Sequence, residues 1–340
     1  MTVRVAIIGA GVMGADHARI FAGDLPGAEL RVVCDASRAS ALRVADECGA
    51  AGTETDPMTT IARDDVDAVV IASPDDTHAP LTIAAIEAGK PVLCEKPLAP
   101  SIEDCRNVMA AEIACGRRLV QLGFMLRFDP SYAEMKVALS AGKIGRALRM
   151  HNFHRNVDSP GAWFTGEMAI TNSASHEFDI ARFVLEAPYI GITAWQPRRS
   201  DDMAAPVMMV LETADGQIVN IEINNNAAYG YDVRGELVGE KGSVVLNAPV
   251  HARYNLGLHC AETYPADWRP RFAHAYRLQN RAWITAIETG APSRVAANSW
   301  DGYCAARIAE AGARALNENR RVSVDVEEPP AFYHDVLVAA

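Results

Sequence analysis

The chain has 340 residues, of which 49% are hydrophobic and 22% are charged. This composition is typical of a folded globular protein of about two domains, and it excludes a disordered, collagen-like or coiled-coil chain. The net charge of −11, from 32 basic and 43 acidic side chains, disfavours nucleic acid as a partner because an acidic surface repels phosphate.

Neither a membrane span nor a signal peptide is indicated by the pattern of apolar residues. The seven cysteines are scattered and form no C-x-x-C pair, which is typical of reduced thiols in the cytoplasm. We therefore expect a cytoplasmic protein that binds neither nucleic acid nor a membrane.

The first 124 residues alternate short apolar strands with helices. Strands are predicted at Val3–Ile8, Leu30–Cys34, Ala68–Ser73, Pro91–Cys94 and Arg118–Gly123, and helices at Gly11–Ala22, Ser37–Cys48, Thr77–Ala88 and Ser101–Cys115. Strands that are apolar along their whole length and alternate with helices predict a parallel sheet covered on both faces. Gly89 and Gly116 stand where two of these helices would end.

From about residue 125, strands of alternating polarity dominate. Such strands are predicted at Ile218–Asn224 and Tyr231–Val238, with Asp215-Gly216 and Lys241-Gly242 as hairpin turns and with helices at Ser175–Leu185, Phe272–Glu288 and Asp301–Asn317. The pattern predicts a mostly antiparallel sheet in a second, α+β domain. We place the domains at residues 1–124 and 125–340.

A glycine-rich loop follows the first strand and opens the first helix. Gly9, Gly11 and Gly14 fit the pattern G-x-G-x-x-G, with Val12 and Met13 inside it. The first glycine would allow the tight turn, the second the approach of a pyrophosphate, and the third close packing of helix against strand. The helix N-terminus would face the phosphate charge, so we expect a dinucleotide to bind here.

The second predicted strand ends in an acidic residue, Asp35, at the usual distance from the glycines. Its carboxylate would accept hydrogen bonds from an adenosine ribose and would repel a 2′-phosphate, which favours NAD over NADP. Arg38 lies close enough to serve such a phosphate, so NADP stays open as an alternative; otherwise Arg38 is a surface helix residue.

Two further loops follow strands of the predicted parallel sheet, Ser73–His78 and Glu95-Lys96-Pro97. Ligands of doubly wound sheets bind beyond the carboxyl ends of the strands. The residues of these loops that we expect at the cofactor site are Ser73, Pro74, His78, Glu95 and Lys96. Asp76 or Thr77 is also expected to cap the helix that follows, and the Lys96–Pro97 bond is compatible with a cis form. Lys96 would hold a substrate oxygen and ease the loss of its proton; otherwise it is a surface lysine that follows a strand.

G-A-G-V-M-G, S-P-D-D-T-H, E-K-P and the later Asn172-x-x-x-His176 together resemble the Gfo/Idh/MocA family of nicotinamide oxidoreductases. The resemblance is closer to the inositol 2-dehydrogenases of that family, and it runs nearly end to end. Matching segments are 119–125, 154–156, 229–232, 236–240, 300–303 and 330–333. The resemblance implies an N-terminal Rossmann domain and a second domain with a large, open, mostly antiparallel sheet, which in this family often builds a homotetramer.

The resemblance also implies a mechanism. A histidine takes the proton of a substrate hydroxyl while hydride leaves the same carbon for nicotinamide. By position this base is His176, with Lys96 orienting the hydroxyl. Inositol dehydrogenases of the family commonly have an Asp four residues before the histidine, whereas this chain has Asn172. Asn can make the same hydrogen bonds as Asp but carries no charge. The resemblance therefore determines the identity of the substrate less well than the reaction class.

Several substrate-side positions follow from the same match. They are Arg127, His154 and Tyr231, together with Asn172 and His176, and Asn156 and Asp179 are further candidates. Asp179 would orient the ring of His176 or pair with Arg182. A zinc site is not indicated, because Ile180 stands where H-E-x-x-H needs its second histidine.

Three functions remain open from the sequence. The first is NAD-dependent oxidation of a secondary hydroxyl of a cyclitol, from an inositol to an inosose. The second, motivated by Asn172, is the same chemistry on another polyol such as an aldose or an aminocyclitol intermediate. The third is a non-catalytic protein that binds NAD.

Overall fold

The computed structural model of the chain describes residues 2–23, 25–159, 161–246 and 253–334. The chain forms two compact units. The first consists of Met1–Phe124, Tyr276–Ala306 and Glu327–Ala340, and the second of Met125–Ala275 and Arg307–Val326. The sequence prediction assigned all of 125–340 to one domain; in the structure, two later segments belong to the first unit instead.

The sheet of the first unit has six parallel strands in the order β3-β2-β1-β4-β5-β6. Their bounds are β1 (Val3–Ile8), β2 (Ala28–Cys34), β3 (Gly52–Glu54), β4 (Ala68–Ile71), β5 (Val92–Cys94) and β6 (Val120–Leu122). The order reverses between β1 and β4, so this is the doubly wound sheet that the apolar strands predict. Ligands of such sheets bind at the reversal, beyond the carboxyl ends of the strands.

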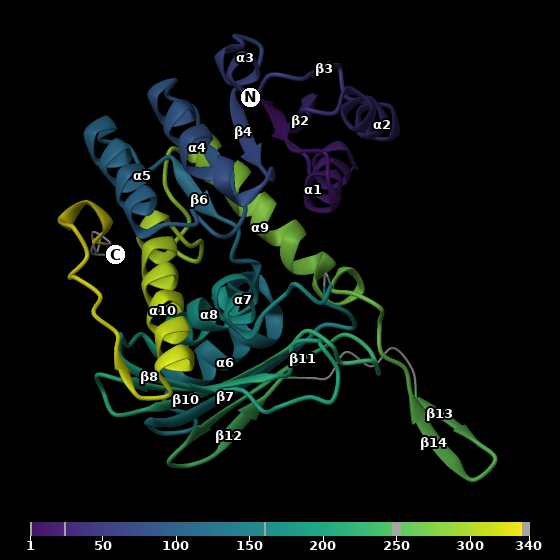
Figure 1. Cartoon of the computed structure of the whole chain (residues 1–340). Helices are drawn as coiled ribbons and strands as arrows, with labels where there is room; N and C mark the ends of the chain where they lie inside the picture. Colours follow the sequence, from purple (N-terminus) through teal and green to yellow (C-terminus); the bar gives the residue numbers. More distant parts are fainter. Residues whose placement is uncertain (1, 24, 160, 247–252, 335–340) are drawn as a thin grey trace. The chain divides into compact units, whose positions relative to one another are not determined.

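Helices connect these strands and cover the sheet (Figure 1). They are α1 (Val12–Gly23), α2 (Arg38–Cys48), α3 (Pro57–Ala62), the 3-10 turn η1 (Asp75–Thr77), α4 (His78–Glu87) and α5 (Ile102–Cys115). Gly116, with φ 68°, ends α5 as predicted. Thr77 precedes α4, but its hydroxyl donates to the Pro74 carbonyl rather than accepting from the helix. Thr77 thus stands at the N-cap position of α4, as predicted, but its side chain makes no capping hydrogen bond.

A C-terminal helix, α9 (Arg269–Thr289), completes the core of the first unit. Trp283 and Ile284 lie in the same buried cluster as Val5 and Phe21. The rings of Phe21 and Trp283 meet edge to face, with centroids 5.9 Å apart. Burial of side chains this large stabilises the fold by roughly 2–3 kcal/mol each, which explains why this segment belongs to the first unit.

A buried carboxylate connects further segments of the first unit. Glu112 on α5 accepts the N–H groups of Leu119 and Val120 at 2.7 and 2.8 Å, and the hydroxyls of Ser299 and Tyr333 at 2.8 Å each. Ser299 begins α10 (Ser299–Glu318), and Tyr333 lies in the 3-10 turn η4 (Ala331–Tyr333). Burial raises the pKa of Glu112, although the four hydrogen bonds favour its charged form.

The second unit is built on a seven-stranded sheet in the order β12-β11-β7-β10-β9-β8-β15. The strands are β7 (Ala147–Arg155), β8 (Tyr189–Trp195), β9 (Val207–Thr213), β10 (Ile218–Asn224), β11 (Asp232–Gly239), β12 (Ser243–Val245) and β15 (Val322–Ser323). All pairings are antiparallel except that of β7 with β10. The predicted hairpins at Asp215-Gly216 and Lys241-Gly242 are confirmed, because they join β9 to β10 and β11 to β12.

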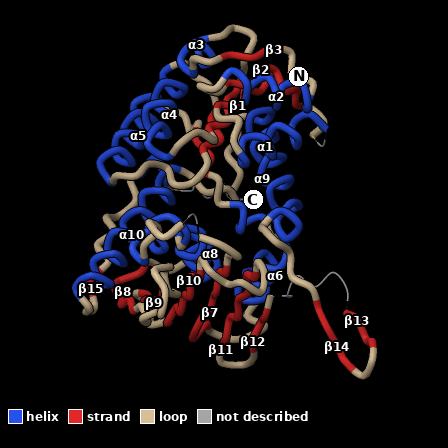
Figure 2. Tube along the Cα trace, turned by 45° about the vertical axis from the view of Figure 1, so that its right-hand side comes forward, coloured by secondary structure: helices blue, strands red, loops and turns tan. Residues whose placement is uncertain are grey.

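One face of this sheet is covered by helices (Figure 1). The segments are the 3-10 turn η2 (Met125–Phe128), α6 (Pro130–Ser140), α7 (Gly166–Met168), the π-helical turn η3 (Ala169–Ser173), α8 (Ser175–Leu185) and the last part of α10. In the tube view these helices lie on one side of the strands (Figure 2).

The opposite face, which we call the open face, carries alternating polar and apolar side chains. Arg155 and Glu222 form a two-pronged ion pair across it, and Trp195 is 48% exposed. The apolar members of the open face include Phe153, Trp195, Met208, Val210, Ile218, Val238 and Val245.

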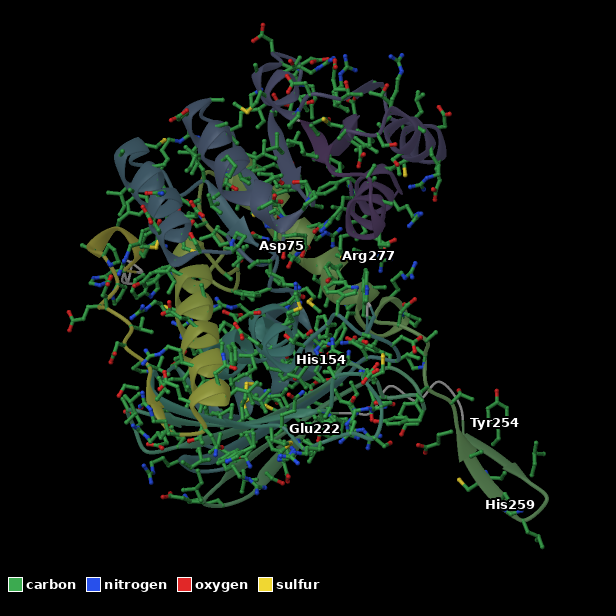
Figure 3. All side chains as sticks on the ribbon, in the orientation of Figure 1. Asp75, His154, Glu222, Tyr254, His259 and Arg277 are labelled. Atoms are coloured by element: carbon green, nitrogen blue, oxygen red, sulfur yellow. The ribbon has the colours of Figure 1, made fainter. Side chains whose placement is uncertain are left out.

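A two-stranded hairpin, β13 (Arg253–Leu256) with β14 (His259–Glu262), extends beyond the sheet and is marked by Tyr254 and His259 in Figure 3.

Candidate active site

The glycine loop of the first unit has the shape that a dinucleotide pyrophosphate needs. A side chain at Gly9 would lie 2.4 Å from the Ala72 carbonyl oxygen, and one at Gly14 would lie 1.8 Å from the Gly9 carbonyl oxygen. A side chain at Gly11 would meet nothing within 4 Å and would fill open space in front of α1. The first turn of α1 also holds no acidic residue. These observations fit the coenzyme, whose pyrophosphate would face the helix N-terminus.

Asp35 stands beside this loop at the carboxyl end of β2. Its Oδ2 accepts the N–H of Ala10 at 2.7 Å, and its Oδ1 accepts the N–H of Ser37 at 2.8 Å. The carboxylate is therefore fixed against the glycine loop, where a ribose would lie. Arg38 is exposed on the first turn of α2, whereas Arg43, which the sequence analysis did not single out, donates to the Ala10 carbonyl at 3.1 Å.

We expect coenzyme choice to depend on this carboxylate. Asp35→Ser should weaken NAD binding roughly 10-fold or more, since a hydrogen bond to a charged group contributes about 1.5–3 kcal/mol. The same change should narrow the preference for NAD over NADP by removing repulsion of a 2′-phosphate. Calorimetric titration with both coenzymes measures this, with Arg38→Ala as the control that leaves NAD affinity unchanged. Tighter binding of NADP than NAD to the unaltered protein would contradict the assignment.

His78 was predicted at the cofactor site, but both its ring nitrogens bond to the main chain. Nδ1 donates to the Pro97 carbonyl at 2.6 Å, and Nε2 donates to the Ser73 carbonyl at 2.9 Å. Two carbonyl partners require two N–H donors, and hence an imidazolium. Burial opposes that charge, but the Cys94 sulfur and the two carbonyls outweigh it and raise the pKa of His78 to about 10. His78 thus connects two loops rather than presenting a free nitrogen.

Glu95, Lys96 and Pro97 follow β5 at the same edge of the sheet, and the Lys96–Pro97 bond is cis. Glu95 is buried, and its Oε1 accepts from Nε2 of His17 at 2.9 Å. Its Oε2 accepts the N–H of Lys96 at 3.3 Å. Asn280 on α9 donates to Nδ1 of His17 at 2.9 Å. The lysine therefore follows a carboxylate that is held in place from two helices.

In the second unit, His176 lies one residue inside α8 and is 6% exposed. The preceding π-helical turn contains Asn172, which is exposed. A π-helical turn is wider than an α-helical one and is frequent at functional sites. Residues four apart across it stay on the same side of the helix, which is compatible with Asn172 acting beside His176.

His154 and Tyr231 are brought together, as the predicted substrate side requires. The Tyr231 hydroxyl donates to Nε2 of His154 at 3.2 Å, and Nδ1 of His154 donates to Oε1 of Glu177 at 2.8 Å. Burial, reinforced by the charge of Glu177, raises the pKa of Tyr231 well above its usual range, so its hydroxyl stays neutral. Figure 3 shows His154 on the helix-covered side of the sheet and Glu222 on the other.

Arg127 and Asp179 form a buried, two-pronged ion pair, with Nε–Oδ2 and Nη2–Oδ1 distances of 2.8 and 2.6 Å. The Arg127 guanidinium also lies over the ring of Phe183, 4.9 Å from its centre. Asp179 thus forms an ion pair with Arg127. The sequence had offered the ring of His176 or Arg182 as its partner. Asn156 meets its neighbours through its main chain, which bonds to Asn224 and Ala227.

The described residues contain no group of three or more His, Cys, Asp or Glu side chains that is arranged to hold a metal ion. Within the same residues, no helix is long and apolar enough to cross a membrane.

Comparison with known proteins places the chain in a family. The family model described as "Oxidoreductase family, NAD-binding Rossmann fold" matches residues 3–124, and the "GFO/IDH/MocA C-terminal domain" model matches residues 132–245. The chain belongs to the GFO/IDH/MocA oxidoreductase family. As a member of it, the protein is an oxidoreductase whose first unit is an NAD-binding Rossmann domain.

Relatives within the GFO/IDH/MocA family are similar over nearly the whole chain. Inositol 2-dehydrogenase 1 of Saccharopolyspora erythraea is 47% identical, over 98% of this chain and 99% of the relative. Inositol 2-dehydrogenase 2 of Paenarthrobacter aurescens is 42% identical, over 94% of this chain and 97% of the relative. The structure of myo-inositol dehydrogenase from Lactobacillus casei, with NAD(H) and myo-inositol, has a TM-score of 0.93 at 28% identity, covering 98% of this chain and all of the other.

Besides Arg43, three residues that hold candidate site residues in place were missed by the sequence analysis. His17 was the polar member of an otherwise small or apolar buried face of α1, formed by Gly14, Ala15, Ala18 and Phe21. Glu177 was an acid inside the buried run of α8. A buried ionisable residue needs a partner, and that signal was available for both. Asn280 gave no comparable signal.

Proposed function

We propose that this GFO/IDH/MocA oxidoreductase is an NAD-dependent cyclitol dehydrogenase, which oxidises one secondary hydroxyl of an inositol to the ketone of an inosose. The observation that carries the proposal is the pair of buried histidines of the second unit, His176 on α8 and His154 bonded to Tyr231 and Glu177. The relatives named inositol 2-dehydrogenase support the substrate class. A ring that carries a hydroxyl on each carbon suits a site lined by such donors and acceptors.

Each residue has one assigned task in this proposal. His176 accepts the hydroxyl proton, because a neutral imidazole is suited to do so near neutral pH. Lys96 donates a hydrogen bond to the same oxygen and stabilises its growing negative charge. The carbon then loses hydride and becomes a carbonyl, and the nicotinamide ring supplies the hydride acceptor when bound. His154, Tyr231 and Arg127 orient the remaining hydroxyls, and Gly9–Gly14 with Asp35 hold the coenzyme.

The test is the absorbance of reduced nicotinamide when the protein meets NAD and single inositol isomers. Turnover on at least one isomer is expected, with NAD preferred over NADP. The proposal fails if the protein reduces no coenzyme on any inositol. If NAD still binds tightly while every polyol is inert, the non-catalytic alternative is favoured.

A second candidate is the same reaction on an aldose or an aminocyclitol. Asn172 motivates it, because this neutral residue stands four positions before the proposed base, where inositol dehydrogenases commonly have an Asp. A rate on one of these polyols that exceeds the rate on every inositol would establish the second candidate and leave the residue roles unchanged.

Asn172→Asp tests whether this position acts on the base. A carboxylate on the same side of the helix favours the charged imidazole and so raises the pKa of His176. The base must be uncharged to accept a proton. The acid limb of the pH profile, where kcat falls as His176 becomes protonated, should therefore move to higher pH. The pH profile of kcat measures this shift, with Asn172→Gln as the uncharged control. An unshifted acid limb would instead assign Asn172 to substrate recognition.

We also propose a cytoplasmic homotetramer. All seven cysteines are free thiols, which suits a reducing compartment. The open face of the second sheet exposes Trp195 beside other apolar side chains, and such patches are typical of interfaces. Light scattering measures the mass, and a monomer at micromolar concentration would contradict the assembly.

A further inference from the structure

Lys96 is the reactive residue of the first unit under the proposed function, and its two chain neighbours are each held by a buried histidine. Glu95 precedes it and receives Nε2 of His17. Pro97 follows it and receives Nδ1 of His78. Both histidines are 1% exposed, so water cannot replace either contact. Neither histidine belongs to the loop itself, since His17 lies on α1 and His78 begins α4.

We propose that His17 and His78 are positioning residues for Lys96, which they fix by holding the side chain of Glu95 and the carbonyl of Pro97. The inference rests on the proposed function, in which Lys96 bonds to the reacting oxygen. A hydrogen-bonding group displaced by about 1 Å can cost 10²-fold in rate. Supports on both sides of one residue are the arrangement that limits such displacement.

The carboxylate of Glu95 is the link on the first side. It accepts from His17 with Oε1 and from the Lys96 N–H with Oε2. Because Asn280 donates to Nδ1 of His17, the ring hydrogen is on Nε2 and is directed at Glu95. Space around the carboxylate is tight, since a side chain at Gly123 would lie 2.8 Å from Oε1. The carboxylate of Glu95 is therefore confined to one position, and the main-chain N–H of Lys96 is hydrogen-bonded to it.

His78 is the link on the second side. It donates to Pro97 through Nδ1 and to Ser73 through Nε2, at 2.6 and 2.9 Å. Both histidines also connect the Lys96 loop to segments that we expect at the coenzyme, because α1 follows the glycine loop and Ser73 lies at the end of β4. Placement of Lys96 is thus tied to the elements that hold the coenzyme.

His17 contacts the Lys96 loop through Nε2, whereas His78 contacts it through Nδ1. Opposite amide substitutions should therefore preserve the two contacts. A Gln amide approximates the position of Nε2, and an Asn amide approximates that of Nδ1. At position 17, His17→Gln keeps the donor to Glu95 and His17→Asn loses it. At position 78 the order reverses, since His78→Asn keeps the donor to Pro97 and His78→Gln keeps only the donor to Ser73.

The experiment measures kcat and the KM for NAD of these four full-length variants on the best cyclitol. We expect His17→Asn and His78→Gln to lose kcat by about 10-fold or more, while His17→Gln and His78→Asn stay within about threefold of the unaltered protein. The KM for NAD should change by less than about threefold in the two His17 variants, because their substitutions leave the glycine loop and Ser73 untouched. His274→Gln, an exposed histidine of α9, is the control with no effect.

A merely structural role does not predict that kcat is higher with Gln at position 17 and higher with Asn at position 78. If only side-chain size or stability mattered, the same amide would be the better substitute at both positions. Equal kcat for Gln and Asn at either position, or the same order at both, would overturn the proposal. Thermal melting of each variant tests folding. Asn280→Ala is a milder variant that should lower kcat several-fold by releasing His17.

A measurement that needs no turnover tests the positioning proposal independently of the proposed function. Hydrogen exchange of the peptide 93–99 should be faster in His17→Asn and His78→Gln than in their partner variants. Suppose that no polyol is oxidised but that peptide 93–99 exchanges faster in His17→Asn and His78→Gln than in their partner variants. The proposed function then fails, and the positioning contacts stand. If turnover is present and exchange is equal in all four variants, the positioning proposal fails alone.

Discussion

His176→Ala is expected to lower kcat by about 10²-fold or more, because a positioned general base contributes typically 10²–10⁴-fold. The histidine lies among the buried residues of α8. Coenzyme affinity should be unchanged, since the first unit alone carries the glycine loop and Asp35. Steady-state kinetics together with a coenzyme titration measure both quantities.

Lys96→Met provides the companion measurement. It keeps the length of the side chain and removes the charge that would stabilise the alkoxide, so a loss of similar size is expected. His151→Gln is the matched control, since His151 is a half-buried histidine on the open face of β7. If either His176→Ala or Lys96→Met kept near-normal turnover, the role assigned to that residue would be wrong.

Asp179→Ala is expected to cost about 3–5 kcal/mol of unfolding free energy, because it leaves the Arg127 guanidinium buried without its carboxylate. The side chains of this pair are 7% and 1% exposed, so solvent screening is slight. A loss of this size lowers the melting temperature by roughly 10 °C for a unit of this length. Denaturant unfolding followed by fluorescence measures the change.

The double variant Arg127→Leu/Asp179→Leu should recover most of that stability, since it removes both buried charges. Arg314→Ala serves as a surface control: it breaks the Arg314–Glu318 pair of α10, whose side chains are 55% and 37% exposed, and should cost under about 1 kcal/mol. A cost below about 1 kcal/mol for Asp179→Ala would show that the ion pair is not what holds α8 against η2.

Features that depend on a few neighbouring residues were predicted well. Gly9, Gly14 and Asp35 were assigned from the spacing of a strand, a turn and a helix, and the structure packs each of them as that spacing requires. The hairpin at Asp215-Gly216 was equally local, since two residues set its geometry. In these cases the backbone conformation follows from residues only a few positions apart.

Features that depend on distant packing were not predicted. His17 meets Glu95 across 78 positions of sequence, and Arg127 meets Asp179 across 52. No periodicity connects such positions, because each contact exists only once the strands and helices are assembled. His78 shows the same limit: its place in S-P-D-D-T-H indicated a cofactor loop, but its contact with the Pro97 carbonyl exists only once the loop after β5 has folded against it.

The helix α9 has a consequence for how the protein can be made and divided. Because Trp283 and Ile284 complete a core that begins with Val5 and Phe21, residues 1–124 alone would expose that apolar surface to water. A gene truncated after the last Rossmann strand should therefore yield an aggregating product rather than a small coenzyme-binding module. On the ribosome, too, the first unit stays incomplete until the second unit, whose main segment interrupts it in the sequence, has been synthesised.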